Sequence, residues 1–222
     1  MGQSINIPTR GTQCIGGYLA KAEGKARGGV VVIQEIFGVT PHIRSVADRF
    51  AAAGYTAIAP AFFDHLESGV ELGYDEAGMA RGKALVTELG LDRAVEDVAS
   101  AAEAIASAGR IGTVGYCWGG TVALLSALRL GLPSVSYYGA RNVPFLAEKP
   151  RAPVMFHFGE HDPSIPPEAV AKHRELLPQM EVHTYPAGHA FNRDGDPHYH
   201  EASARLAWQR TLAFFGRELA GA

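Results

Sequence analysis

The sequence predicts an α/β fold with a mostly parallel central sheet and helices on both faces. Short apolar runs alternate with helix-like segments along the chain, and residues 30–34 have the continuous apolar character of a strand buried on both faces. The chain has 222 residues, 47% hydrophobic and 19% charged, which is enough for one sizeable core. We therefore expect a single domain that spans residues 1–222.

The first half of the chain supplies the early strands and helices. A segment around Cys14 is strand-like, and Gly28 and Gly29 lead into the buried strand at 30–34. Pro41 suits the first turn of a helix over 41–53, and Gly54 suits its end. The remaining elements predicted here are a strand at 55–59, an irregular segment at 60–76, and helices at about 77–89 and 92–108.

The second half continues the alternation without an internal repeat or a long linker. Strands and helices that follow one another in this way form parallel sheets, in which ligands bind beyond the carboxyl ends of the strands. The predicted strands are 111–115, 134–138, 154–158 and 181–185. The predicted helices are 118–130, 167–177 and 198–217.

Charge and composition narrow the classes of partner. The formal net charge is −3, and the 20 Lys and Arg residues are scattered, so no basic patch indicates nucleic acid. No run of about 18 apolar residues indicates a membrane span, and the first 30 residues do not resemble a secretion signal. We expect a cytoplasmic monomer with a small-molecule substrate and no disulfide between Cys14 and Cys117.

The run Gly115-Tyr116-Cys117-Trp118-Gly119 lies between a predicted strand and a predicted helix. This is the context of a nucleophile elbow, a strained corner at which flanking glycines relieve crowding around the central residue. The central residue here is Cys117, which indicates a thiol nucleophile where the wider pattern has a serine. The motif alone is weak evidence, because 26 glycines make chance matches common.

A thiol attacks as the thiolate, so Cys117 needs a base or a positive charge beside it. His189 follows the last predicted strand, and Asp162 follows the strand before it, where a carboxylate can orient the imidazole. Taken singly, Asp162 could be a turn residue and His189 an ordinary loop residue. In the order Cys117, Asp162, His189, each behind its own strand, they favour the catalytic triad of an α/β-hydrolase.

The other eight histidines fit structural roles better. Four lie inside predicted elements or loops without a companion group, and four form two sequence-local pairs that lack a third and fourth metal ligand. We therefore expect no metal and no cofactor. The first group comprises His42, His65, His173 and His183, and the second comprises His157, His161, His198 and His200.

Ester chemistry also needs donors for the developing oxyanion. In this architecture they are the backbone N–H after the nucleophile, here that of Trp118, and one behind an early strand, here that of Ile36. The neighbouring Glu35 closes an apolar strand. Its carboxylate either reaches solvent or faces the thiol.

These residues resemble those of the dienelactone hydrolase (carboxymethylenebutenolidase) family of α/β-hydrolases over nearly the whole chain. The resemblance is carried by Gln34-Glu-Ile-Phe-Gly-Val39, Val114-Gly-Tyr-Cys-Trp-Gly-Gly120, Tyr137-Tyr-Gly139, the turn at Asp162 and the loop at His189. The resemblance implies that Glu35 lies against a neutral Cys117 thiol in the resting enzyme. A substrate carboxylate would draw an arginine away from Glu35, and Glu35 would deprotonate Cys117. His189 would then activate water to hydrolyse the thioester.

The resemblance also implies which residues bind the substrate. The family uses two arginines to hold a substrate carboxylate, and Arg193 matches the one that lies four residues after the histidine. The other falls on Met79 when the segments are laid without gaps, and Arg81 lies two residues further, about 200° around a helix. Phe37 and Tyr138 complete the implied substrate-binding set.

Three functions remain open from the sequence. The first is a thiol-dependent hydrolase of small lactones or esters, including carboxylate-bearing dienelactones. The second is a broad carboxylesterase with a neutral pocket, favoured if Arg81 does not reach the substrate. The third, of another class, is a non-hydrolytic binding or redox-sensing protein that uses Cys117 as an exposed thiol, for which Asp162 and His189 would be superfluous.

Overall fold

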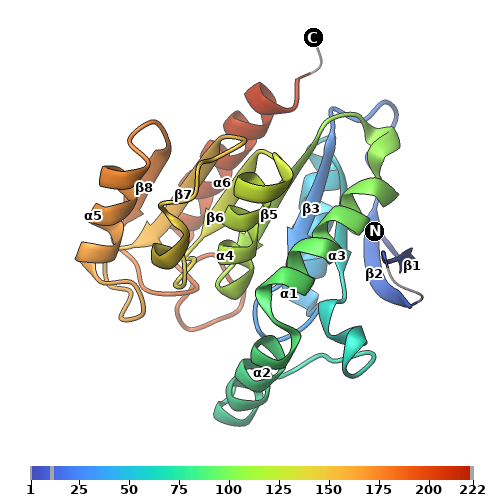
Figure 1. Cartoon of the computed structure of the whole chain (residues 1–222), viewed down its shortest axis with the longest axis horizontal. Coiled ribbons are helices and arrows are strands. Elements are labelled where there is room, and N and C mark those ends of the chain that lie inside the picture. The colour runs from blue at the N-terminus through green and yellow to red at the C-terminus, as the bar shows by residue number, and fades with distance from the viewer. Residues whose placement is uncertain (1, 11–12, 221–222) are drawn as a thin grey trace. The chain divides into compact units, whose positions relative to one another are not determined.

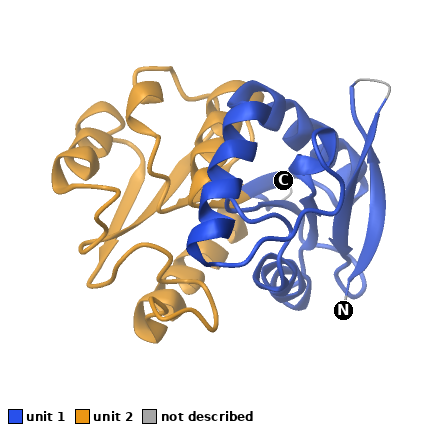
Figure 2. Cartoon of the chain, turned by 90° about the horizontal axis from the view of Figure 1, so that it is seen from below, with its two compact units in different colours: residues 1–113, 219–222 blue, residues 114–218 orange. Residues whose placement is uncertain are grey.

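The computed structural model describes residues 2–10 and 13–220 and divides the chain into two compact units. Unit 1 comprises the described residues up to Thr113 together with Leu219 and Ala220. Unit 2 comprises Val114–Glu218, drawn in orange in Figure 2. The single domain expected over 1–222 stays a prediction.

Unit 1 is built around strand β3 (Gly29–Ile33), whose five residues are all buried. Successive side chains of a strand point to opposite faces, so this pattern requires a cover on both. Helices α1 (Pro41–Ala52) and α3 (Leu91–Ala104) both pack on β3 and on its parallel neighbour β4 (Thr56–Pro60). The predicted strands at 30–34 and 55–59 and the predicted helix at 41–53 are thus confirmed.

The remaining elements of unit 1 lie before and after this core. Strands β1 (Gln3–Pro8) and β2 (Cys14–Ala20) pair antiparallel, and β2 also pairs antiparallel with β4. The others are the 3₁₀ turns η1 (Phe62–His65) and η2 (Ala106–Ala108), helix α2 (Glu76–Leu89), and the first half of strand β5 (Ile111–Tyr116).

Unit 2 continues with buried parallel strands and their covering helices. Strands β6 (Ser134–Tyr137) and β7 (Val154–Gly159) are buried along their whole length, and β7 pairs in parallel with β6 and β8 (Glu181–Tyr185). Helix α4 (Trp118–Leu125) packs on β6, α5 (Pro167–Leu176) on β8 and α6 (Glu201–Glu218) on β7. The short turns are η3 (Ser126–Leu130) and η4 (Val143–Phe145).

The strands follow the order β1-β2-β4-β3-β5-β6-β7-β8 in an eight-stranded sheet. Within unit 2, Figure 1 shows β6, β7 and β8 in this order. Three described pairings are parallel, and only those that involve β2 are antiparallel. The predicted α/β class with a mostly parallel sheet is confirmed. Within residues 2–10 and 13–220, no helix is long and apolar enough to cross a membrane.

The structure differs from the sequence prediction in four elements. The helix predicted over about 92–108 ends at Ala104, and the separate 3₁₀ turn η2 follows it. Strand β1 was not predicted, because only Ile7 of its six residues is buried and the apolar signal is correspondingly weak. The helix predicted over 118–130 ends at Leu125 and passes into the π-turn η3, beside a Ser126 hydroxyl that donates to the Val122 carbonyl at 2.8 Å. The last helix begins at Glu201 rather than at 198.

Candidate catalytic site

Cys117 occupies a strained corner between β5 and α4. Its φ of 55° and ψ of −117° lie outside the regions that ordinary residues favour, which costs about 1–3 kcal/mol. The Cys117 N–H donates to the Tyr137 carbonyl at 3.0 Å, which holds the corner against β6. A Cβ on Gly115 would lie 1.8 Å from the Gly119 carbonyl oxygen, so the corner requires glycine there. The predicted strand, turn and helix are all present.

His189 and Asp162 meet at the ends of the last two strands of unit 2. The Nδ1 atom of His189 lies 2.6 Å from Oδ2 of Asp162, whose side chain is fully buried. The other carboxylate oxygen accepts the Ser164 N–H at 2.8 Å, which fixes the plane of the carboxylate. Asp162 therefore accepts the Nδ1 proton of His189 and leaves Nε2 for a second partner.

A close approach of two backbones brings these residues together. A Cβ on Gly159, the last residue of β7, would lie 2.3 Å from the Ala187 carbonyl oxygen. The N–H groups of Glu160 and His161 donate to the carbonyls of Tyr185 and Ala187 at 2.8 and 3.0 Å. The turn that carries Asp162 is thus fastened to the loop that carries His189. Gly159 was not identified from the sequence, because a glycine at a strand end gives no local sign of the backbone that packs against it.

Cys117 contributes to the protonation state of His189. Burial disfavours the imidazolium, but hydrogen bonds with Asp162 and Cys117 and the negative charges of both raise the pKa of His189 to about 10. The imidazole therefore carries its proton at neutral pH. The Cys117 sulfur, the imidazolium and the Asp162 carboxylate, joined in one row by hydrogen bonds, can perform nucleophilic attack and then protonate a leaving group.

The Tyr138 ring packs beside the imidazole of His189. The Tyr138 ring lies 5.0 Å from that of His189 and 5.5 Å from that of Phe191, and Tyr138 itself is fully buried. Tyr138 has a φ of 39° and Ala190 a φ of 61°, so non-glycine residues adopt left-handed backbone beside His189. The sequence analysis missed Phe191, because one aromatic residue in a loop gives no local signal of its contacts.

Arg193 is held by a carboxylate that the sequence analysis did not single out. Its Nη1 lies 2.6 Å from Oδ2 of Asp196, and the two side chains are only 9% and 5% exposed. Asp196 also accepts the backbone N–H of His198 at 2.8 Å and lies 2.8 Å from the ring Nδ1 of His198. Opposite charges three residues apart in Arg193-Asp-Gly-Asp196 were the available signal.

Four of the predicted site residues belong to unit 1. Glu35 and Ile36, in the turn after β3, are 1% and 8% exposed. Phe37 is buried and packs edge-on against Tyr74, with ring centroids 4.8 Å apart. A Cβ on Gly82 would lie 2.1 Å from the Ile36 carbonyl oxygen, so α2 lies directly against this turn.

Arg81 lies on α2, one residue before the point at which this helix touches the turn after β3. Its guanidinium lies 2.6 Å from the Glu67 carboxylate, and half of its side chain is exposed. Met79, on which the family arginine falls in an ungapped match, is 42% exposed. Arg81 is therefore an accessible charge with an acidic partner of its own.

The expectation that His65, His173 and His183 lack a companion group was wrong. His65 lies 2.9 and 3.0 Å from the two carboxylate oxygens of Asp97, and burial raises the pKa of that carboxyl while the bond with His65 opposes it. His173 accepts a hydrogen bond from Asn142, and His183 lies 3.3 Å from Glu181. The partners of His65 and His173 lie 32 and 31 residues away in the sequence, so the residues around each histidine could not reveal them.

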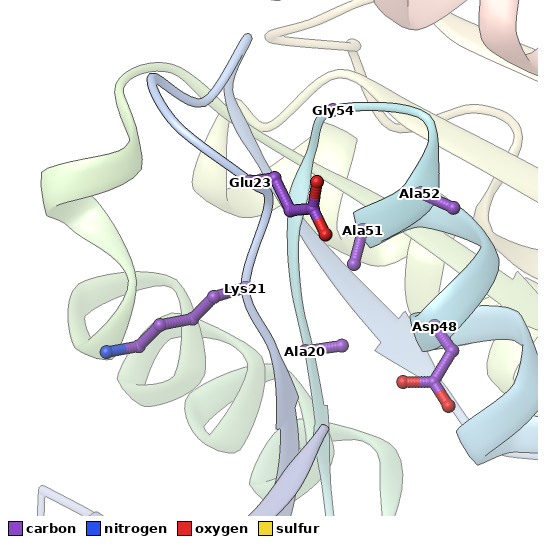
Figure 3. A pocket seen from close by; sticks show the side chains of 7 residues that line it. All are labelled: Ala20, Lys21, Glu23, Asp48, Ala51, Ala52 and Gly54. Carbon is purple, nitrogen blue, oxygen red and sulfur yellow. The ribbon is translucent and has the colours of Figure 1, made fainter. Parts of the chain in front are cut away.

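Two further features of the described residues can be compared with this site. Across the part of the chain that the structure describes, no group of three or more His, Cys, Asp or Glu residues could hold a metal ion. A hollow beside α1 in unit 1 contains neither an imidazole nor a thiol, and its one lysine extends away from Asp48 (Figure 3). Its lining residues are Ala20, Lys21, Glu23, Asp48, Ala51, Ala52 and Gly54.

Known proteins resemble this chain over nearly its full length. The model of the dienelactone hydrolase family matches residues 15–219. A candidate carboxymethylenebutenolidase of Salmonella typhimurium is 35% identical over 96% of this chain and 86% of its own, and carboxymethylenebutenolidase 1 of Cupriavidus pinatubonensis is 30% identical over 96% and 95%. The crystal structure of a candidate dienelactone hydrolase from Klebsiella pneumoniae has a TM-score of 0.85 and 32% identity, covering 98% of both chains.

Proposed function

Because the chain belongs to the dienelactone hydrolase family, we propose that it hydrolyses small lactones or esters with Cys117 as nucleophile, His189 as proton carrier and Asp162 as orienting carboxylate. Membership in this family makes it a hydrolase of ester or lactone bonds. The observation that carries the residue assignment is the 2.6 Å bond between His189 and Asp162, together with the hydrogen bond of His189 to Cys117.

In this mechanism, acylation begins from a Cys117 thiolate beside a His189 imidazolium. The Cys117 thiolate attacks the carbonyl carbon, a C–S bond forms, and the carbonyl electrons move to oxygen. When the tetrahedral intermediate collapses, the C–O bond to the leaving group breaks, and the His189 imidazolium gives its proton to the departing oxygen. The product of this step is a thioester on Cys117 and a neutral imidazole.

Backbone N–H groups would hold the oxyanion of this intermediate. Trp118 follows Cys117 at the first position of α4, where the N–H groups of the first turn lack carbonyl partners within the helix. The second donor in our proposal is the N–H of Ile36. Together they would stabilise charge that exists only in the transition state and the intermediate.

Deacylation uses the same imidazole in the opposite direction. The thioester sulfur carries no negative charge, so two of the contributions that raise the pKa of His189, the bond and the charge of Cys117, are lost. The imidazole can then take a proton from water while Asp162 keeps Nδ1 protonated. Hydroxide attacks the thioester carbonyl, the C–S bond breaks, and the carboxylic acid product is released. The departing Cys117 thiolate then lies beside the His189 imidazolium, as before acylation.

Glu35 has a second proposed role in acylation. The family resemblance gives it the thiol proton when a substrate carboxylate arrives, whereas the raised pKa of His189 favours the imidazole as holder of that proton. The two fit together if His189 suffices for neutral esters and Glu35 adds a gate for anionic substrates. A carboxylate that is 1% exposed at the end of an apolar strand supports a functional role for Glu35.

The substrate class has two candidates. A carboxylate-bearing lactone would use Arg193 and Arg81, with Phe37 and Tyr138 as the apolar walls. A broad carboxylesterase is favoured by a specific observation, because each arginine already contacts an acidic side chain, Asp196 or Glu67, at 2.6 Å. A cytoplasmic location and a monomeric state stay predictions from the sequence.

One assay set tests the function and separates the substrate classes. Wild type and Cys117→Ala would be compared on a carboxylate-bearing dienelactone and on a neutral aryl ester. We expect Cys117-dependent turnover of both, with the higher kcat/KM on the dienelactone. Turnover of the neutral ester alone would assign the broad esterase, and turnover of neither would exclude the hydrolytic role of Cys117 and leave the thiol-sensing alternative.

A further inference from the structure

The ion pair between Arg193 and Asp196 lies within a short loop that returns upon itself. The Arg193 N–H donates to the Ala190 carbonyl at 2.9 Å, and the Asp196 N–H donates to the Arg193 carbonyl at 3.2 Å. The His200 N–H donates to the Phe191 carbonyl at 3.0 Å and closes the loop just before α6. The pair is thus built into the segment that begins directly after His189.

Asp196 makes its bonds with donors from this loop. Its Oδ2 accepts from Arg193 at 2.6 Å, and its Oδ1 lies 2.8 Å from both the backbone nitrogen and the ring Nδ1 of His198. Burial alone would raise the pKa of Asp196, but the bonds from His198 and Arg193 hold it below its usual value. The carboxylate is therefore charged at neutral pH.

A nearly buried ion pair is a poor device for stability. Removing two charges from water costs several kcal/mol per ion, which their attraction often fails to recover. With 9% and 5% exposed side chains, Arg193 and Asp196 carry this cost in a loop whose backbone bonds already define its shape. Such a pair is better explained by what the guanidinium binds in the working enzyme.

We infer that Asp196 is an internal competitor for the substrate's carboxylate, and that it sets how strongly Arg193 distinguishes anionic from neutral substrates. This inference rests on the proposed function, which assigns Arg193 to the substrate. Asp196 occupies Nη1 of Arg193, so a ligand carboxylate that pairs bidentately with Nη1 and Nη2 must share Nη1 with Asp196 or displace it. Asp196 would lower the affinity for anions without altering the chemistry at Cys117.

The test replaces Asp196 by its neutral isostere. In Asp196→Asn the amide oxygen can still accept from His198, while the negative charge on Arg193 is gone. The matched control is Asp194→Asn, which removes one acidic charge from an exposed position of the same loop. The binding probes are benzoate and benzamide, which differ in charge but little in shape, measured by isothermal titration with the whole chain.

We expect Asp196→Asn to bind benzoate roughly five- to tenfold more tightly than wild type, as a charge-assisted bond becomes available, and benzamide unchanged. The kcat/KM ratio of carboxylate-bearing over neutral ester should rise by a similar factor through KM. Asp194→Asn should leave both ratios unchanged, and Asp196→Asn combined with Arg193→Gln should lose the gain.

The inference is overturned if Asp196→Asn leaves benzoate binding unchanged or weakens it, or if Asp194→Asn gives the same gain. Weaker binding would mean that Asp196 holds Arg193 in its binding geometry. Because the titration measures binding and does not require turnover, it tests the role of Asp196 separately from the proposed hydrolysis. If neither ester is turned over in a Cys117-dependent manner but Asp196→Asn still binds benzoate more tightly, the proposed hydrolysis is wrong, while the competition of Asp196 for Arg193 is supported.

Discussion

Replacing Asp162 by Asn tests the assignment of the imidazole as proton carrier. The change keeps the shape of the side chain, and its Oδ1 can still accept the Ser164 N–H. It removes the charge that lies 2.6 Å from Nδ1 of His189 in a fully buried position. It also allows an NH₂ group to face Nδ1, which favours the tautomer with the proton on the wrong nitrogen.

The expected loss follows from the bond that is broken. A hydrogen bond to a charged group contributes about 1.5–3 kcal/mol, which corresponds to a roughly 10- to 150-fold fall in kcat. If the wrong tautomer dominates, the fall can approach the about 10⁴-fold seen for the same replacement in Ser-His-Asp proteases. We therefore expect Asp162→Asn to lose at least about tenfold in kcat.

The pH profile of kcat/KM gives a second readout. Against the lowering effect of burial, Asp162 and Cys117 raise the pKa of His189 to about 10, so wild-type activity should decline at alkaline pH as the imidazolium is lost. Removing the Asp162 charge lowers that pKa, so the alkaline limb should move to lower pH. Rates would be measured on a neutral aryl ester, whose binding does not depend on either arginine.

The matched control is Glu160→Gln, the same chemical change two residues away on an exposed side chain. The bond from Glu160 to Tyr185 is made by its backbone N–H and survives the change. We expect this variant to keep its activity within about twofold and its alkaline limb in place. An Asp162→Asn enzyme with more than a third of wild-type activity and an unmoved alkaline limb would refute the reasoning.

Three further changes test the glycine before the elbow, the pair of His65 with Asp97, and the proposed role of Glu35. Gly115→Ala places a Cβ 1.8 Å from a carbonyl oxygen and should lower the free energy of unfolding, measured by denaturant titration, by more than about 3 kcal/mol. The control Gly188→Ala places its Cβ 3.8 Å from the nearest atom and should lower that free energy far less. Equal losses in the two variants would contradict this expectation. His65→Ala leaves the buried Asp97 carboxylate without its imidazole and should lower the free energy of unfolding by about 3 kcal/mol. His65→Gln should recover part of this loss. A loss near zero in His65→Ala would show that the pair does not stabilise the fold. Glu35→Gln should reduce turnover of the carboxylate-bearing lactone much more than that of the neutral ester, and an equal reduction would argue against a substrate gate.

The sequence predicted those features that are written in short stretches of chain. Continuous apolar runs such as Val30–Val32 identified the buried strands, because a strand covered on both faces has no polar alternation. The placement of Cys117, Asp162 and His189, each behind its own strand, predicted that the last two would meet, since parallel strands end at one edge of a sheet.

The features that were missed depend on contacts between distant segments. The His65 and Asp97 pair joins residues 32 apart, and no periodicity of either segment encodes it. Gly159 looks like any strand-end glycine until the Ala187 backbone is found against it. The pKa of His189 is the balance of burial against two neighbouring charges, which sequence order cannot supply. Asp196 could have been found from its spacing to Arg193, but its burial could not.

The central claim is that Cys117 carries the acyl group. An aryl acetate would be mixed with enzyme, quenched in acid within the first turnover, and the protein analysed by intact mass and peptide mapping. His189→Gln, in which deacylation should be the slower step, would be run beside wild type. If Cys117 is the nucleophile, one acetyl group should appear on the peptide that contains Cys117, enriched in His189→Gln and absent from Cys117→Ala. An acetyl group on another residue, or wild-type turnover by Cys117→Ala, would contradict it.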